Sequence, residues 1–373
     1  MKILCTSDWH LHNFKDYARN TQVTWKEEVQ RFVQQEEGSI LMNSRLLNTL
    51  EGLCDMRDYC ITHNVSEVLM AGDMFHKRGI IDVTVYNATY KLLESFRDAG
   101  IKIHAISGNH DQVDMGENPQ SSLYPFRNLI HVIDQPEIIK LGDLKVVAVP
   151  YRKSKEQTLQ SIEKLKSSVD IKKSILMVHL GMTGGKVGSG MYAMSDEFTE
   201  EDLNPEDWGF IVMGHYHQPQ VFPCGNMFYC GTPVQNSFSD ELPDGGYNGF
   251  YLIDTLRTDN PKFKPIKRPR FITIKSQEEL KSMTPEDLKN NFTRIRVKAE
   301  EVKELEEFCT PEAEIKVEVV KDYTSTKRSE ISISDTFENA VKTSVKESDL
   351  PEEVKPKYTT KGLEILAKAE GEK

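Results

Sequence analysis

The stretch Val-Leu-Met-Ala-Gly-Asp-Met-Phe-His occupies residues 68–76 and joins an apolar run to a polar cluster. The four apolar residues that begin it are typical of a strand buried in a sheet. Gly72 and Asp73 end this run, and His76 follows shortly after. Because ligands of open α/β sheets collect beyond the carboxyl ends of the strands, this stretch predicts a functional site at one edge of a sheet.

Four other apolar runs in the chain end in polar clusters of the same kind. These clusters are Asp8-Trp9-His10, Gly108-Asn109-His110-Asp111, His179, and Gly214-His215-Tyr216-His217. Each cluster alone is a weak signal, but the ordered set contains six of the ten histidines, and we expect it to converge on one site. The other histidines, for which we expect structural roles, are His12, His63, His104 and His131.

Helical segments separate the first three predicted strands. Apolar residues repeat at helical spacing between residues 40 and 63. Asp82 predicts the N-cap of a second helix that runs to Ala99, where Gly100 supplies the stop. The alternation of strands and helices with short connections predicts parallel strands joined by right-handed crossovers.

Strand-like segments dominate the next part of the chain. They lie at residues 138–141, 144–149, 175–179, 210–214 and 247–254, with turns predicted at Gly142–Asp143 and Gly225–Asn226. The segment 247–254 is expected to be the last strand of the large domain. Together these patterns predict an α/β fold in which two sheets pack face to face as a sandwich, with helices on the outside.

A change of composition predicts a domain boundary at residues 257–275. This stretch has seven basic residues, one acidic residue and three prolines. Beyond it, strand, helix and strand patterns at 292–297, 301–308 and 315–320 predict a small α/β unit, and the polar C-terminal residues are helix-like. We therefore expect a large domain at 1–256, a basic linker at 257–275, a small domain at 276–330 and a helical tail at 331–373.

The residue types at the strand ends suit a pair of divalent metal ions. Asp, Asn and His supply oxygen and imidazole donors without a thiolate, which favours manganese or iron over structural zinc. Because residues i and i+2 of a strand point the same way, Asp8 and His10 are expected to aim at one ion, and His215 and His217 to lie together beside the pair. Asp73 is the best candidate to bridge the two ions.

The ordered motifs D-x-H, GD, GNHD, H and G-H-x-H resemble the calcineurin-like metallophosphoesterase superfamily over about residues 1–255. Within it, SDWHL, GDMFH and GTPVQNSF (231–238) are similar to the SbcD-type DNA double-strand-break repair nucleases, in a short version like those of bacteriophages. The strings GDMFHKRG and GNHD differ from those of the protein phosphatases. Two departures from the nuclease pattern are His12, where a glycine is usual, and an apparent insertion at 21–39.

The resemblance implies a role for each motif residue. One ion would be bound by Asp8, His10, Asp73 and His217, and the other by Asp73, Asn109, His179 and His215. Two Mn²⁺ are expected, with Mg²⁺ or Fe²⁺ as alternatives. His110 would stabilise the transition state and donate a proton to the leaving sugar oxygen, oriented by Asp111 or His76, which are also candidates for the catalytic set.

The resemblance also implies the function. It predicts a manganese-dependent DNA nuclease, with double-strand exonuclease and single-strand endonuclease activity, that acts in recombination and double-strand-break repair. The small domain would cap the DNA site. The helical tail would dock on the coiled coil of an SbcC-type ABC ATPase, and the family is usually a homodimer. Two alternatives remain: a phosphodiesterase for nucleotides or other small molecules, and a non-catalytic scaffold for the ATPase.

The net charge of −11 argues against a protein that coats nucleic acid through bulk positive charge, although it permits local contacts. The candidate DNA contacts are Arg152, Lys153, Lys264, Lys267, Arg268 and Arg270. No apolar run approaches the ~18 residues needed to span a bilayer, and the N-terminal apolar run is too short for a signal peptide. None of the six cysteines forms a C-x-x-C pair. We expect a cytoplasmic protein without a membrane partner.

Overall fold

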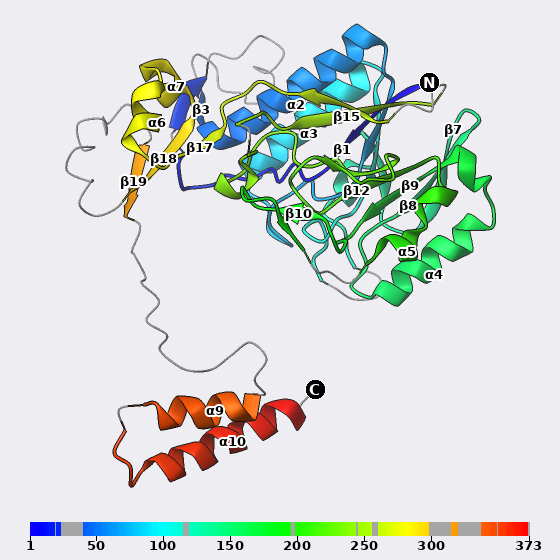
Figure 1. Cartoon of the computed structure of the whole chain (residues 1–373). Coiled ribbons are helices and arrows are strands. Elements are labelled where there is room, and N and C mark those ends of the chain that lie inside the picture. Colours follow the sequence, from blue (N-terminus) through cyan, green and yellow to red (C-terminus); the bar gives the residue numbers. More distant parts are fainter. Residues whose placement is uncertain are drawn as a thin grey trace. The chain divides into compact units, whose positions relative to one another are not determined.

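Two β-sheets make up most of the first part of the chain (Figure 1). The computed structural model describes residues 1–18, 20–23, 40–114, 119–194, 198–243, 245–255, 260–297, 315–319, 337–348 and 350–371. The chain divides into two compact units, residues 1–319 and 320–373, and both sheets belong to the first unit.

The first sheet has the strand order β16-β15-β1-β4-β5-β6. Its strands are β1 (Lys2–Thr6), β4 (Glu67–Met70), β5 (Lys102–Ile106), β6 (His131–Ile133), β15 (Gly249–Asp254) and β16 (Lys262–Pro265). The four strands from β1 to β6 pair in parallel, which confirms the prediction. The expectation that the segment ending at Asp254 is the last strand was wrong, because β16 continues the same sheet by pairing antiparallel with β15.

Helices α2 (Ser44–His63) and α3 (Val83–Asp98) pack on this sheet. Asp82 caps α3 by accepting a hydrogen bond from the Thr84 amide, as predicted. The predicted start of the first helix at residue 40 was wrong. Residues 40–43 form β3 (Ile40–Asn43), which pairs with β2 (Asn20–Val23), and the Asn43 side chain then caps α2.

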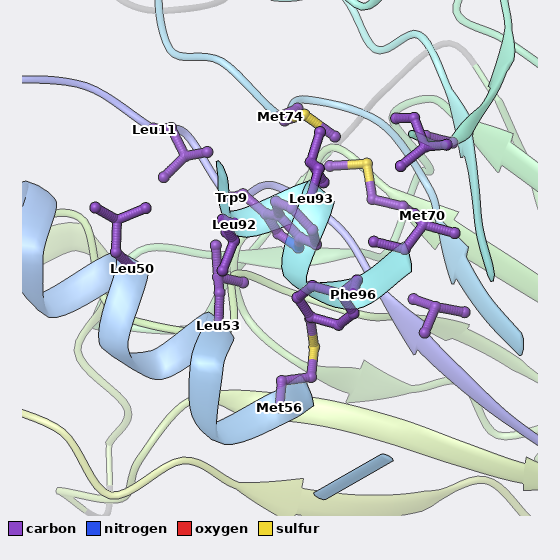
Figure 2. Packing of buried hydrophobic residues seen from close by; sticks show 14 of the residues in the cluster. Trp9, Leu11, Leu50, Leu53, Met56, Met70, Met74, Leu92, Leu93 and Phe96 are labelled. Atoms are coloured by element: carbon purple, nitrogen blue, oxygen red, sulfur yellow. The ribbon is translucent and has the colours of Figure 1, made fainter. Parts of the chain in front are cut away.

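Apolar side chains from both helices meet the strand ends in one core (Figure 2). Trp9 is fully buried there, and its indole nitrogen donates to Thr6 Oγ1 at 3.0 Å. It lies among residues such as Leu53 of α2 and Phe96 of α3. Since Trp9 separates Asp8 from His10, its burial fixes the backbone that holds both predicted ligands.

The second sheet has the strand order β13-β14-β12-β9-β8-β7. Its strands are β7 (Glu137–Leu141), β8 (Leu144–Val149), β9 (Ser174–His179), β12 (Phe210–Gly214), β13 (Gln220–Val221) and β14 (Met227–Tyr229). A layer that includes Ile3, Leu69, Val146 and Met177 fills the space between the sheets. Helix α4 (Lys155–Lys166) packs on the outer face. The predicted α/β sandwich flanked by helices is therefore confirmed.

Short elements connect the main strands. They are η1 (Tyr124–Phe126), η2 (Ile171–Lys173), β10 (Lys186–Val187), β11 (Tyr192–Ala193), α5 (Glu200–Leu203), η3 (Pro205–Asp207) and η4 (Phe238–Asp240).

A third, parallel sheet of order β17-β18-β19 follows in the chain. It contains β17 (Phe271–Ile274), β18 (Phe292–Val297) and β19 (Ile315–Val319), with α6 (Gln277–Ser282) and α7 (Pro285–Asn290) beside it. The helix predicted at 301–308 lies outside the described residues. The segment 257–275 was expected to be a linker, but its described residues include β16 and β17 and are therefore built into two sheets.

The second unit contains α9 (Phe337–Lys346) and α10 (Lys355–Gly371). The helices approach closely, because a Cβ atom at Gly362 would lie 2.7 Å from Val341 Cγ1. Among the residues described, none of the helices combines the length and apolar character required to cross a membrane.

Candidate metal centre

The strand ends converge through backbone turns rather than through extended strand geometry. Four residues of the predicted set have positive φ angles: Asp8 (52°), His10 (46°), Asp73 (60°) and His215 (113°). Each such conformation costs a non-glycine residue on the order of 1–3 kcal/mol, and such strain clusters at functional sites. The argument from alternating strand side chains was therefore wrong, because all four residues follow β1, β4 or β12.

Glycines let the turns approach one another. A Cβ atom at Gly108 would collide with the Oδ1 and N atoms of Asp73. A Cβ atom at Gly214 would collide with the carbonyl oxygen of Ala71. These close contacts explain why the residues before Asn109 and His215 are glycines.

Asp8, His10 and His217 form the first group of candidate ligands. The Nε2 atoms of His10 and His217 lie 3.0 Å apart, and His10 Nε2 lies 3.9 Å from Asp8 Oδ1. His217 Nδ1 lies 2.9 Å from Asp240 Oδ1. When Nδ1 donates its proton to Asp240, Nε2 keeps a lone pair that points towards His10.

The buried carboxylate of Asp240 was not among the predicted site residues. It is 1% exposed, and its Oδ2 accepts hydrogen bonds from the amides of Asn236 and Ser237. These bonds hold Asp240 beside His217. Its position 23 residues after His217, outside the five motifs, explains why no sequence pattern identified it.

The second group surrounds the side-chain oxygen of Asn109. His179 Nε2 lies 2.9 Å from Asn109 Oδ1, and His215 Nδ1 lies 3.2 Å from it. The other ring nitrogen of His179 lies 2.7 Å from the carbonyl oxygen of Ala71, which fixes the ring. The four predicted ligands of the second ion therefore lie together, because Asp73 also contacts this group.

Asp73 lies between the two groups. Its Oδ2 is 3.7 Å from His10 Nε2 and 3.4 Å from His179 Nε2. Its Oδ1 accepts a hydrogen bond of 2.8 Å from the amide of His110. This is the position that a bridging carboxylate requires.

The electrostatic environment differs between the histidines of the centre, because burial and the neighbouring His217 lower the pKa of His10 well below its usual value. Burial lowers the pKa of His179 and His217, but Asp73 acting on His179 and Asp240 acting on His217 outweigh it and raise both pKa values to about 9. Burial disfavours the charged form of Asp73, yet His179 and His10 outweigh it and lower the pKa of this carboxyl. The carboxylates of Asp73 and Asp240 therefore favour positive charge at His179 and His217.

The donors fit two divalent ions. Within the described residues, ligand atoms lie within 4.8 Å of one another in three groups: Asp8–His10–His217, Asp8–Asp73–His179 and His10–His76–His110. Carboxylate oxygens, an amide oxygen and imidazoles form a mixed set without a thiolate, as borderline divalent ions prefer. The first two groups match predicted ligands, whereas the third joins a ligand to the two candidate catalytic histidines.

His110 lies beside the candidate ligands, and one of its ring nitrogens already makes a hydrogen bond within the protein. Its Nδ1 lies 2.5 Å from the carbonyl oxygen of His76, so that Nδ1 is the donor and Nε2 is the other proton site. Its ring centroid is 5.0 Å from that of His10. His76 stacks on His110 at 5.6 Å and orients it through its backbone carbonyl.

Asp111 occupies a different position from the catalytic one predicted. It is fully buried, and its oxygens accept hydrogen bonds from the amides of Asp73, Phe75 and Gly108 at 2.8, 3.1 and 3.0 Å. Burial, reinforced by Asp73, raises the pKa of Asp111 to about 7. Its carboxylate therefore joins the turns at residues 73–75 and 108–111 and does not orient the His110 ring.

The candidate DNA contacts fall into two classes. Arg152 is buried and donates to the carbonyl oxygens of Tyr151 and Asp134, and Arg268 pairs with Glu51 and Asp55. These two guanidinium groups are thus committed to partners within the protein, contrary to the role predicted for them. The others have surface positions: Lys153 and Lys267 are exposed, Lys264 lies half-buried in β16, and Arg270 lines a cleft.

Comparison with known proteins identifies the family of the chain. Residues 1–219 match the family described as calcineurin-like phosphoesterase. The chain is 25% identical over 270 residues to exonuclease subunit 1 of Enterobacteria phage T4, covering 71% of this chain and 68% of the relative. It is 25% identical over 307 residues to the SbcD subunit of the nuclease SbcCD from Staphylococcus epidermidis, covering 74% and 72%. A solved dimetal phosphatase from Danio rerio is 11% identical, with a TM-score of 0.39 over 68% of this chain and 91% of the other.

Proposed function

The chain belongs to the calcineurin-like phosphoesterase family, and from this premise we propose that it is a manganese-dependent DNA nuclease that works with an ATPase subunit. The family places it among the metal-dependent hydrolases of phosphoester bonds, which use a dinuclear metal site. The single observation that best supports the proposal is the position of Asp73 between two groups of candidate ligands.

Each candidate ligand has a distinct task in this proposal. Asp8, His10 and His217 would hold one ion, Asn109, His179 and His215 would hold the other, and Asp73 would contact both. When bound, the ions would lower the pKa of a coordinated water and neutralise charge on the phosphate. Asp240 would keep His217 in the tautomer that leaves Nε2 free to bind a metal.

His110 would handle the proton of the leaving group. Its Nδ1 is held by the His76 carbonyl, so a proton carried on Nε2 can pass to the leaving sugar oxygen. His76 would position His110 rather than touch the substrate. Asp111 would keep the backbone of both residues in place through its bonds to the amides of the two turns.

A cleft of about 750 Å³ lies beside the third sheet, and we propose that it holds an extended substrate. Its charged lining residues are the basic Arg270, Lys275, Arg294 and Arg296 and the acidic Glu241 and Glu279, and both Arg294 and Arg296 also pair with Glu318. Phosphate contacts of this kind position a nucleic acid without reading its sequence. Two relatives are named as nucleases, which also favours DNA over a small phosphodiester. We propose that the small domain at 276–330 caps the substrate along this cleft.

The helical tail at 331–373 is proposed to bind the coiled coil of the ATPase. Both named relatives are subunits, which supports a partner for this chain. In α10, Tyr358 is 54% exposed and Ile365 is 60% exposed, as an apolar contact with another helix would require. Deleting residues 331–373 should abolish co-purification with the ATPase while manganese-dependent cleavage remains. Unchanged complex formation would refute this assignment. We also propose a homodimer, to be tested by light scattering.

The test of the nuclease function is a substrate comparison. Linear duplex DNA, single-stranded DNA and bis(p-nitrophenyl) phosphate are each incubated with the protein and Mn²⁺, with and without the ATPase subunit. Cleavage of both DNA forms, lost in Asp73→Asn, supports the proposal. Hydrolysis of the small diester with no cleavage of either DNA form would contradict it.

A further inference from the structure

Three exposed basic side chains lie close in the chain to the candidate metal centre. They are Lys15, Lys77 and Arg78, and we call them the basic rim. Within the part of the chain that the structure describes, none of the three makes an ion pair or a hydrogen bond through its side chain. They differ in this respect from Arg152 and Arg268, whose guanidinium groups bind partners within the protein. The charges of the basic rim are therefore available to a ligand.

The two segments that carry the basic rim leave the metal centre side by side. The amide of Leu11 donates to the carbonyl oxygen of Met74 at 2.9 Å, and Leu11 forms a parallel β-bridge with Phe75. The carbonyl oxygen of His76 accepts the hydrogen bond from His110 Nδ1. Because Lys77 and Arg78 directly follow His76, they begin where the candidate catalytic histidine is held.

An aromatic cluster of three rings joins these two segments. The centroid of the Phe14 ring lies 4.6 Å from that of His12 and 4.6 Å from that of His76, and the two imidazoles are 5.1 Å apart. All three side chains are half-buried, so each keeps some surface open to solvent. Aromatic rings flanked by unpaired cations are typical of surfaces that bind single strands, where bases stack and phosphates meet the positive charges.

The carboxylates of the same segments are engaged elsewhere. Asp16 Oδ1 lies 3.6 Å from Lys316 Nζ. Asp82 Oδ1 accepts hydrogen bonds from Asn13 Nδ2 at 3.0 Å and from the Thr84 amide at 2.8 Å. Neither carboxylate lies within ion-pair distance of the basic rim, which explains how three cations remain unpaired near one another.

Arg45 connects the aromatic cluster to the cleft beside the third sheet. Its guanidinium carbon lies 4.0 Å from the centroid of the Phe14 ring and 5.1 Å from that of Phe271. Phe271 lines the cleft of about 750 Å³. Neighbouring side chains thus lead from the cleft through Phe14 to His76, and the basic rim lies at the end of this path. A strand bound in the cleft can follow the path to the rim.

We propose that the basic rim binds phosphate groups of the DNA strand next to the bond that is cleaved, while the aromatic cluster receives an adjacent base. This inference rests on the proposed nuclease function and identifies a substrate surface for it. The contacts go to the backbone and to ring faces, so they accept any sequence. A small phosphodiester has no flanking phosphates and would not use the rim.

The test removes two charges of the basic rim in the full-length protein. The double variant Lys77→Gln/Arg78→Gln should lower the slope of log affinity against log salt for single-stranded DNA by about 1.4, at roughly 0.7 for each lost phosphate contact. Fluorescence anisotropy of labelled DNA, with a chelator that prevents cleavage, measures the slope. The matched control is Lys172→Gln/Lys173→Gln, which removes two exposed charges at the opposite end of β9 from His179 and should keep the wild-type slope.

Two further measurements make the outcome specific. The Tm of both double variants should match that of wild type, because all four side chains are exposed. In wild type, a methylphosphonate that neutralises one phosphate beside the cleavage position should weaken binding, and in Lys77→Gln/Arg78→Gln it should have little further effect. A wild-type slope in Lys77→Gln/Arg78→Gln would overturn the role of the rim and leave the nuclease function standing. Wild-type protein that hydrolyses bis(p-nitrophenyl) phosphate but cleaves no DNA would instead contradict the nuclease function.

Discussion

His10 Nε2 and His217 Nε2 lie 3.0 Å apart although 207 residues separate them in the chain. His217 Nδ1 is directed at Asp240, which leaves Nε2 as the nitrogen that faces His10. The carboxylate of Asp8 lies nearby, with its Oδ1 3.9 Å from His10 Nε2. The contact between the two histidines is thus the geometric basis for the first of the two proposed ions.

Asp240→Asn should weaken manganese binding without removing a ligand. The amide lacks the negative charge that keeps the proton on His217 Nδ1, so the manganese concentration at half-maximal activity should rise by about 10–100-fold. The maximal rate at saturating Mn²⁺ should change far less. A manganese titration of the cleavage rate measures both. Asp143→Asn, in an exposed turn, is the control, and an unchanged midpoint in Asp240→Asn would contradict the assigned role.

His110→Ala should reduce kcat by about 10²–10⁴-fold, because it removes the proposed proton donor. The amount of bound manganese should remain that of wild type. His76→Ala keeps the backbone carbonyl that holds His110 and should reduce kcat much less. Single-turnover cleavage with parallel metal analysis separates the two effects. An equal loss in both variants would mean that the His76 ring itself takes part.

Asp111→Ala should destabilise the protein by about 2–4 kcal/mol, because it leaves several buried amides without an acceptor. The free energy of unfolding from urea denaturation measures this loss. Asp143→Ala should have an unfolding free energy close to that of wild type. Full stability with reduced activity in Asp111→Ala would instead restore the catalytic role predicted from the sequence.

Arg270→Ala should weaken DNA binding and lower the slope of log affinity against log salt by about 1, as expected for the loss of one phosphate contact. Arg152→Ala should leave that slope unchanged and lower stability, because its guanidinium binds carbonyl oxygens within the protein. Fluorescence anisotropy at several salt concentrations provides the comparison. Equal slopes for wild type and Arg270→Ala would exclude this contact.

The residues that follow the strands could be predicted from the sequence, because a change from apolar to polar at a buried strand end is a local pattern. The helix cap at Asp82 was also predicted, because the preference of aspartate for the N-cap position is a local signal. The left-handed backbone at Asp8 and Asp73 was not, since that strain is maintained by packing around Trp9 and by hydrogen bonds from distant turns. Local propensity cannot reveal such forces.

Contacts between segments that are far apart in the sequence could not be predicted either. Asp240 meets His217 only because η4 folds back over the site. Arg268 lies in a basic stretch that suggested a DNA contact, yet the fold places it beside Glu51 and Asp55. In both cases the partner, rather than the residue type, determines what the side chain does.

The number of manganese ions bound per chain, measured together with the rate of duplex DNA cleavage, tests the central claim most directly. Chelation should stop cleavage, and the rate should recover as binding approaches about two ions per chain. Full cleavage activity with fewer than two ions bound would contradict the two-metal account.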